Sequence, residues 1–382
     1  MKKEYKQGSY GFDKQFLASK LDVVELSNEK SKVIVVPKYQ GRVMTSTCRG
    51  NEGNSYGWIN YELIKSGEVL EHMNGFGGEE RFWLGPEGGQ FSIFFKKGVS
   101  FDFENWFTPK EIDTEAFKLV SNTDKSASFE QDMNLENYSG TKFSLKVNRI
   151  INLLSTESIT KNLNIDVSEL DEVAYETINK LTNTGQDSWD ENSGMLSIWL
   201  LGMLNPSPEV TVVIPVKQGS VEELGAEVND NYFGKISPDR LKTENNIVFF
   251  KADGNSRGKI GISPKRAKPI LGSYDAKNNI LTIVEVILPK NESKYVNSAW
   301  ELQDDPFSGD AINSYNDGPL EDGSQMGPFY EIESSSPALA LKPGGSYTHI
   351  QRTYHFEGNV EKLDKIAQKL LGVSISEINK QF

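Results

Sequence analysis

The chain has 382 residues, which is enough for two or three ordinary domains or for one large β-architecture. Its formal net charge is −13, from 41 basic and 54 acidic residues without a basic cluster, so nucleic acid and anionic lipid are poor candidates as partners and a neutral or cationic small ligand is favoured. The single cysteine, Cys48, excludes an internal disulfide and a thiolate zinc site, and no run of about eighteen apolar residues could span a membrane.

The N-terminal residues lack the apolar core of a signal peptide. This leaves the compartment open: cytoplasmic as the sequence reads, periplasmic if a leader has been removed. We expect a monomer or a weak dimer.

Residues 1–21 are polar and predict an arm with one or two helical turns within 13–20. From residue 22 onward, short β-branched runs between Gly, Pro and Asn predict one strand after another. The clearest run alternates apolar and polar residues, with a bulge expected at Arg149. A short helix is expected within 57–67, and 195–204 is either a buried strand or a short helix. Strands are predicted at 31–37, 41–47, 91–98, 99–107, 143–155, 210–216, 246–264, 278–289, 329–343 and 346–356.

The C-terminus has the pattern of an amphipathic helix. Asn359 is a typical N-cap, the apolar side chains of Val360, Leu363, Ile366 and Leu370 follow one helical face, and Gly372 stands at the C-cap position. No repeat of 20–50 residues and no composition break divides the chain. We therefore expect an all-β protein: an arm (1–21), a single domain (22–358), and a helical segment (359–382) packed on it.

A glycine-rich stretch, 71–92, is the strongest candidate for a binding site. It contains six glycines, and between them stand polar, charged and aromatic residues: His72, Asn74, Glu79, Glu80, Arg81, Trp83 and Glu87. An aromatic ring can stack on the apolar face of a pyranose while charged groups bind its hydroxyls, and such residues are concentrated on loops. The alternative is a glycine-rich hairpin with Trp83 in the core and the charges in water.

A second polar patch covers 297–319. Its Trp300 could stack on a sugar, and its oxygen-bearing residues could bind hydroxyls or a calcium ion, or could simply form turns: Asn313, Tyr315, Asn316 and Asp317. Lys259 stands between Gly258 and Gly261 in a predicted strand, and its side chain is expected to point either into a cleft or into solvent. Calcium is the only cofactor that the sequence suggests. The support is weak, because the spacing of the oxygen-bearing residues in 297–319 does not match an EF-hand loop.

Three segments together resemble a known family. They are GG-x-x-R-x-W-x-G-P in the first half, TNTG near the middle, and a late strand with acidic residues followed by a PG turn. This order resembles the galactose mutarotase-like superfamily, which comprises aldose 1-epimerases and uncharacterised relatives. The resemblance implies a β-supersandwich of large antiparallel sheets with a short C-terminal helix, within an uncharacterised branch that carries GGEERFWLGPEGG.

The resemblance also implies catalytic residues. It places the general base at Glu333, with Glu331 as the alternate register, and both should share one strand face. The family's acid histidine is missing from 182–193, and the chain has only three histidines. His72 could supply the proton or hold a hydroxyl, whereas His349 and His355 fit structural roles.

These observations predict a carbohydrate-active or carbohydrate-binding protein with a small-molecule or oligosaccharide ligand, and specifically an aldose 1-epimerase-like isomerase. Two alternatives remain. A non-catalytic carbohydrate-binding protein is favoured by the missing histidine. A glycoside hydrolase or lyase on the same scaffold would need two carboxyl groups a few ångströms apart.

Overall fold

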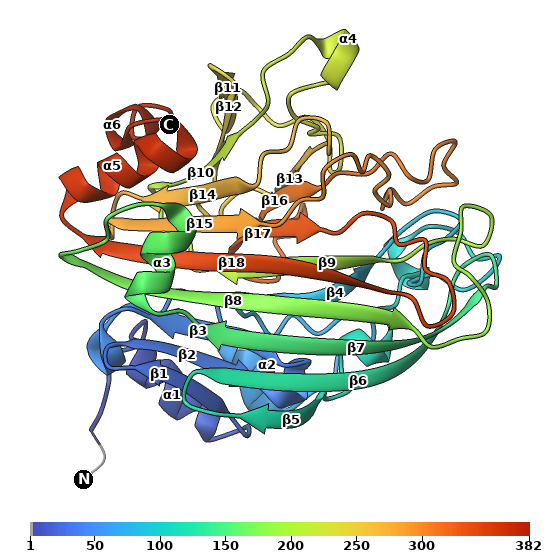
Figure 1. Ribbon diagram of the computed structural model, residues 1–382, viewed down its shortest axis with the longest axis horizontal. Helices are drawn as coiled ribbons and strands as arrows, with labels where there is room; N and C mark the ends of the chain where they lie inside the picture. The colour runs from blue at the N-terminus through green and yellow to red at the C-terminus, as the bar shows by residue number, and fades with distance from the viewer. Residues whose placement is uncertain (1–2) are drawn as a thin grey trace.

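The computed structural model describes residues 3–382 and contains three antiparallel sheets (Figure 1). The smallest sheet has three strands near the N-terminus: β1 (Val24–Asn28), β2 (Ser31–Val36) and β3 (Arg42–Thr47). Short β-branched runs form these strands, as the sequence predicts.

The largest sheet has ten strands. Its spatial order is β11 (Leu241–Glu244), β12 (Ile247–Lys251), β10 (Val210–Pro215), β14 (Ile270–Asp275), β15 (Ile280–Val286), β18 (Ser346–Gly358), β8 (Leu170–Asn183), β7 (Lys142–Leu153), β6 (Ser126–Glu136) and β5 (Lys118–Asn122). Its central strands alternate buried and partly buried residues, which is typical of a sheet with one face in the core.

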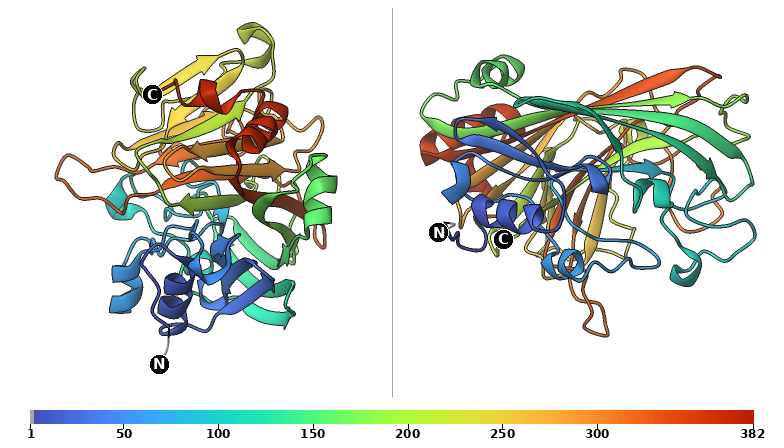
Figure 2. Two further views of the ribbon diagram at one scale, coloured as in Figure 1. Left: turned by 90° about the vertical axis from the view of Figure 1, so that its left-hand side faces the viewer. Right: turned by 90° about the horizontal axis from the view of Figure 1, so that it is seen from below.

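A five-stranded sheet lies behind the ten-stranded sheet in Figure 1. Its order is β13 (Gly258–Ile262), β16 (Ile312–Asn316), β17 (Tyr330–Ser335), β9 (Ser197–Leu204) and β4 (Arg81–Gly85). Seen from below, the long strands of the larger sheet run across the top, with the five-stranded sheet beneath them (Figure 2, right). The hydroxyl group of Ser334 on β17 bonds to His349 and Gln351 on β18, so this face of the smaller sheet points into the core.

The helices are peripheral. They are α1 (Tyr10–Ala18), α2 (Tyr61–Ser66), α3 (Thr156–Leu163), α4 (Val221–Leu224), α5 (Val360–Leu371) and α6 (Ile375–Ile378). The Asn359 side chain caps α5, and Gly372 ends it in the left-handed conformation, as predicted. The apolar face of α5 packs with α6 on strands of the ten-stranded sheet.

Two predictions are wrong in detail. The residues 91–98 and 99–107 form no strands and contain one 3-10 turn, because their aromatic side chains pack into a cluster instead of a ladder. The predicted bulge at Arg149 is also absent within the described ladders, since β7 pairs with β6 and β8 in unbroken register. Arg149 itself occupies the inward position and is fully buried.

The charge of Arg149 is balanced inside the molecule. Its Nη2 donates to Glu80 Oε1 at 2.9 Å, its Nε donates to the Gly41 carbonyl at 3.0 Å, and its Nη1 donates to Asn179. Gln351 donates to the second oxygen of Glu80 at 3.0 Å. This buried ion pair and its neighbours join β7, β8 and β18 of the ten-stranded sheet to the segments that lead into β3 and β4.

Candidate active site

The outer face of the five-stranded sheet collects polar and aromatic side chains. Antiparallel register places Lys259, Tyr315, Glu331 and Met203 in one row across four strands. A second row contains Asn313, Glu333, Leu201 and Arg81, and a third contains Ser335, Trp199 and Trp83. Because side chains alternate along a strand, all of these point away from the core face that carries Ser334. Five distant parts of the sequence thus meet on one surface, which we call the outer face.

Glu333 lies at the middle of the outer face and is fully buried. Its Oε2 accepts hydrogen bonds from Trp199 Nε1 at 2.8 Å and from Lys259 Nζ at 3.1 Å. Its Oε1 has no hydrogen-bond partner within residues 3–382. One oxygen of Glu333 is therefore held in place, and the other leaves a hydrogen-bonding position unused within the described residues.

Glu331 lies two residues away on the same strand and is 7% exposed. Burial, followed by the charge of Glu333, raises the pKa of the Glu331 carboxyl well above its usual range. Burial alone would lower the pKa of Lys259, but the negative charges of Glu333, Glu87 and Glu331 outweigh it and raise that pKa. The two carboxyl groups and the ammonium group form one electrostatic unit.

A small pocket opens beside this unit. Its walls are Ser197, Trp199, Tyr232, Lys259, Val296, Ser298, Asp310, Asn313 and Ser335. The empty space among these residues is about 330 Å³, but only about 20 Å³ of it admits the centre of a water molecule. The pocket as it stands therefore has room for about one water molecule.

Aromatic rings form a wall next to the pocket. The rings of Trp83 and Trp199 lie 5.8 Å apart, and Trp83 also contacts Phe94. Phe94 stacks on Trp106, which stacks on Trp300. The Lys259 ammonium lies 4.6 Å from the centre of the Trp199 ring. Such rings can pack against the C–H groups of a sugar.

Unsatisfied polar atoms are concentrated here. Within residues 3–382, eleven buried side-chain polar atoms lack a hydrogen-bond partner. Four of them belong to the outer face: Arg81 Nε, Trp83 Nε1, Ser197 Oγ and Glu333 Oε1. They include donors and acceptors. Since buried polar groups are normally paired, a group of unpaired ones indicates a place for a polar ligand.

The glycine-rich segment divides its residues between the two faces. Arg81 lies on the outer face, where its Nη2 donates to Asp113 at 2.8 Å and its guanidinium group lies 3.9 Å from the centre of the Trp83 ring. Glu87 accepts from Trp300 Nε1 at 3.1 Å, and burial raises the pKa of its carboxyl. Asn74 Nδ2 also donates to Asp113, at 2.7 Å.

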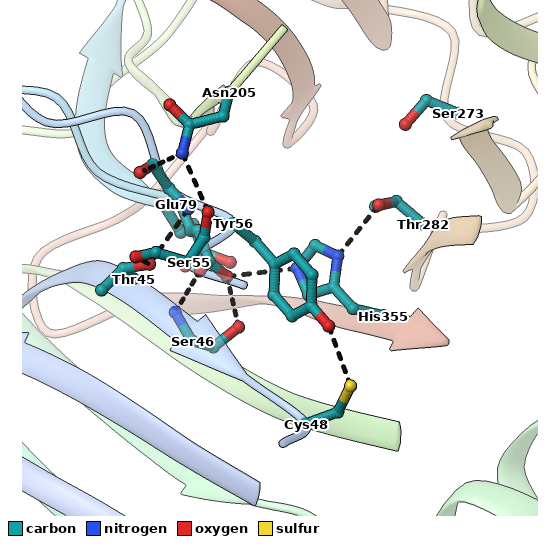
Figure 3. A network of polar contacts seen from close by, with 12 residues as sticks. Thr45, Ser46, Cys48, Ser55, Tyr56, Glu79, Asn205, Ser273, Thr282 and His355 are labelled. Carbon is teal, nitrogen blue, oxygen red and sulfur yellow. Dashed lines mark hydrogen bonds and ion pairs between the residues drawn. The ribbon is translucent and has the colours of Figure 1, made fainter. Parts of the chain in front are cut away.

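Glu79 points into the core. It accepts from Ser46 Oγ at 2.9 Å and lies 3.2 Å from His355 Nε2, in the polar network shown in Figure 3. In the same network, His355 Nδ1 pairs with Thr282 at 2.9 Å, and Tyr56 stacks on the imidazole ring. Its neighbour Glu80 pairs with Arg149, so both acids already have partners between the sheets.

His72 lies beside the aromatic wall. Its Nδ1 pairs with the Trp106 carbonyl at 2.7 Å, and its ring packs on Phe103 and Phe107. No hydrogen bond joins His72 to Glu333 in the described chain. The ring reaches the site only through intervening aromatic residues.

The residues of the second polar patch, 297–319, also lie on both faces of the five-stranded sheet. The Tyr315 hydroxyl donates to Asp317 at 2.6 Å, and Asp317 accepts from the Gly327 amide at 3.0 Å. Asn316 points to the core face and pairs with the turn at 254–256. Across the described residues, no group of three or more His, Cys, Asp or Glu side chains is arranged to hold a metal ion.

Sequence reasoning did not single out Trp199, Tyr232 or Asp310. Trp199 stands in the apolar run 195–204, where nothing distinguished it from core residues. If the run is taken as a strand paired with the strands of Glu333 and Trp83, Trp199 falls on the outer face. Burial raises the pKa of the Asp310 carboxyl, which accepts from the Tyr232 hydroxyl at 2.6 Å.

The family model named DUF6786 matches residues 8–382. The chain belongs to DUF6786, a family of unknown function. No curated protein matches this DUF6786 protein. None of the helices in the described part of the chain is long and apolar enough to cross a membrane.

Solved structures show the fold of the DUF6786 protein. A candidate aldose 1-epimerase from Escherichia coli K12 is similar to it with a TM-score of 0.53 and 12% identity, over 88% of this chain and 99% of that one. The Slr1438 protein from Synechocystis sp. PCC 6803 has a TM-score of 0.53 and 10% identity, over 89% and 96% of the two chains. A galactose mutarotase-like protein from Lactobacillus casei ATCC 334 has a TM-score of 0.46 and 10% identity, over 88% and 100%. The fold is galactose mutarotase-like, as the sequence resemblance implies.

Proposed function

We propose that this DUF6786 protein is a carbohydrate-active enzyme, an aldose 1-epimerase-like isomerase that uses Glu333 as its general base. The observation that carries the proposal is the unpaired Glu333 Oε1, buried among other unpaired donors and acceptors and next to a wall of tryptophan rings. Sugar hydroxyls both donate and accept hydrogen bonds, so a sugar could satisfy such a mixed set. The structural likeness to a candidate aldose 1-epimerase supports the same choice.

The contacts of Glu333 suit a base. Lys259 and Trp199 hold one oxygen of Glu333 with hydrogen bonds, which fixes the plane of the carboxyl group. The other oxygen would take the proton of the anomeric hydroxyl. General-base catalysis by a positioned carboxylate typically contributes about 10²–10⁴-fold in rate.

Polarimetry of freshly dissolved α-galactose and α-glucose tests this proposal. We expect wild type to accelerate mutarotation of at least one sugar, and we expect Glu333→Gln to lose about 10²–10⁴-fold of that rate. Circular dichroism of both proteins should be the same, which separates lost chemistry from lost fold.

Binding must be measured in parallel, by the quenching of tryptophan fluorescence on sugar addition. If Glu333→Gln binds but does not turn over, Glu333 acts chemically. If wild type binds a sugar and accelerates nothing, the carbohydrate-binding alternative replaces the enzyme. If wild type neither binds nor accelerates either sugar, the proposal is wrong for simple aldoses.

A further inference from the structure

The outer face offers a proton donor that is not a histidine. Residues two apart on a strand rise about 6.6 Å and share one face, so the carboxyl groups of Glu331 and Glu333 lie side by side. Both side chains are buried. Two negative charges buried side by side destabilise each other, which favours a proton on one of the two carboxyl groups.

The surroundings decide which carboxyl group is protonated. Glu333 accepts two donors on one oxygen, and one of these is the Lys259 ammonium. The groups that face Glu331 are Lys259 on β13, Tyr315 on β16, Arg81 on β4, Asp317 after β16, and Glu333 itself. Arg81 is already paired with Asp113. Within the described residues, the Lys259 ammonium is hydrogen-bonded to Glu333, whereas the buried carboxyl group of Glu331 has no such donor, so Glu331 is the partner that keeps the proton.

We propose that Glu331 is the general acid of the epimerase reaction and occupies the role that a histidine has in the galactose mutarotase-like superfamily that the sequence resembles. This inference rests on the proposed function. It assigns acid and base to two carboxyl groups whose environments differ, which is how such pairs divide their roles in other enzymes.

The step balances as follows. Glu333 takes the proton of the anomeric hydroxyl, and that O–H electron pair forms the carbonyl bond. The bond between the anomeric carbon and the ring oxygen breaks, and the ring oxygen receives the proton of Glu331. Rotation about the bond to the next carbon and the reverse step give the other anomer, and each carboxyl group returns to its starting state.

The total charge does not change during this step. Before and after it, the two carboxyl groups together carry one negative charge and one proton. Lys259, with its ammonium 3.1 Å from Glu333 Oε2, balances that charge in both states. A buried site that keeps its net charge constant avoids the cost of creating a charge away from water.

The experiment compares wild type, Glu331→Gln and a control, Glu130→Gln, which changes an acid on β6 of the other sheet that pairs with Lys118 and Lys146. Mutarotation is measured across pH, and infrared difference spectra record the stretching band of protonated carboxyl groups at pH 7. We expect Glu331→Gln to lose about 10²–10⁴-fold in kcat with little change in KM. We expect wild type to show a protonated-carboxyl band at pH 7 that Glu331→Gln lacks and Glu130→Gln keeps. Wild-type activity should also fall at alkaline pH as Glu331 loses its proton.

The outcomes separate the two proposals. An active wild type with an equally active Glu331→Gln overturns the acid role and leaves the proposed function intact. An active wild type without the protonated-carboxyl band also overturns it. A wild type inactive on every sugar overturns the proposed function and the catalytic role of Glu331 together. If Glu331→Gln fails to fold, the pH dependence of the wild-type rate still decides, since a rate that does not fall at alkaline pH overturns the acid role.

Discussion

Replacing Arg149 by methionine tests whether the buried ion pair with Glu80 holds the sheets together. The variant keeps most of the side-chain volume but removes three hydrogen bonds to Glu80, Gly41 and Asn179. It leaves the Glu80 carboxylate fully buried, with Gln351 as its remaining side-chain amide donor. Removing one partner of a buried pair costs about 3–5 kcal/mol.

The expected shift in Tm follows from chain length. At about 2.1 cal/mol/K per residue, the 382 residues give an unfolding entropy of about 0.8 kcal/mol/K, so a loss of about 4 kcal/mol lowers Tm by about 5 °C. Burial already raises the pKa of the Glu80 carboxyl. Without Arg149 that carboxyl binds a proton more readily, so the deficit in stability should be smaller at pH 5 than at pH 8.

The assay is urea unfolding of Arg149→Met, Glu80→Gln and the double variant. The double variant should be destabilised by less than the sum of the single variants, because it leaves no unpaired charge in the core. Lys118→Met, which breaks an exposed pair with Glu130, should cost less than about 1 kcal/mol. A loss below 1 kcal/mol for Arg149→Met, or strict additivity, would refute this reasoning.

Two further predictions concern other buried acids and donors. Burial raises the pKa of Asp13 to about 6, above its unfolded value of about 3.8, so its contribution to stability is complete below about pH 4 and is lost as pH rises through about 6. Asp13→Asn should therefore be more stable than wild type at pH 7.5, by roughly 2–3 kcal/mol in urea unfolding, and should lose that advantage at pH 4; equal stability at both pH values would contradict the linkage. Trp199→Phe keeps the ring wall but removes the 2.8 Å hydrogen bond to Glu333, which is worth about 1.5–3 kcal/mol. Under the proposed function, its mutarotation rate should fall about 10–100-fold with an unchanged circular dichroism spectrum, and an unchanged rate would show that this bond does not hold the base.

Alternation and turn chemistry predicted much of the sheet architecture. The strands around Val147 and the terminal helix after Asn359 follow directly from period and capping. A bulge was predicted at Arg149 because charged residues seldom occupy inward positions of a sheet. The ion pair with Glu80, which is distant in the sequence, stabilises the buried charge. The run at 91–107 was misread because strands and aromatic clusters use the same residue types.

The candidate site was likewise predicted only in part. Glu331, Glu333, Arg81, Trp83 and Lys259 were all expected near a ligand, and the structure brings them to one face. No local pattern distinguishes acids on that face from Glu79 and Glu80, whose partners lie on β18 and β7. Whether a side chain points to the outer face or to the core depends on partners that are distant in the sequence. A short stretch of sequence does not contain that information.

The strand order of the five-stranded sheet has a consequence for synthesis on the ribosome. β17 lies between β16 and β9, although it follows β9 by more than a hundred residues in the chain. Until that late strand emerges, the apolar β9 presents an open edge that can pair with other unfolded chains. A nascent chain that stalls before β17 carries this open edge and lacks Glu331 and Glu333, so interrupted translation should yield products that aggregate.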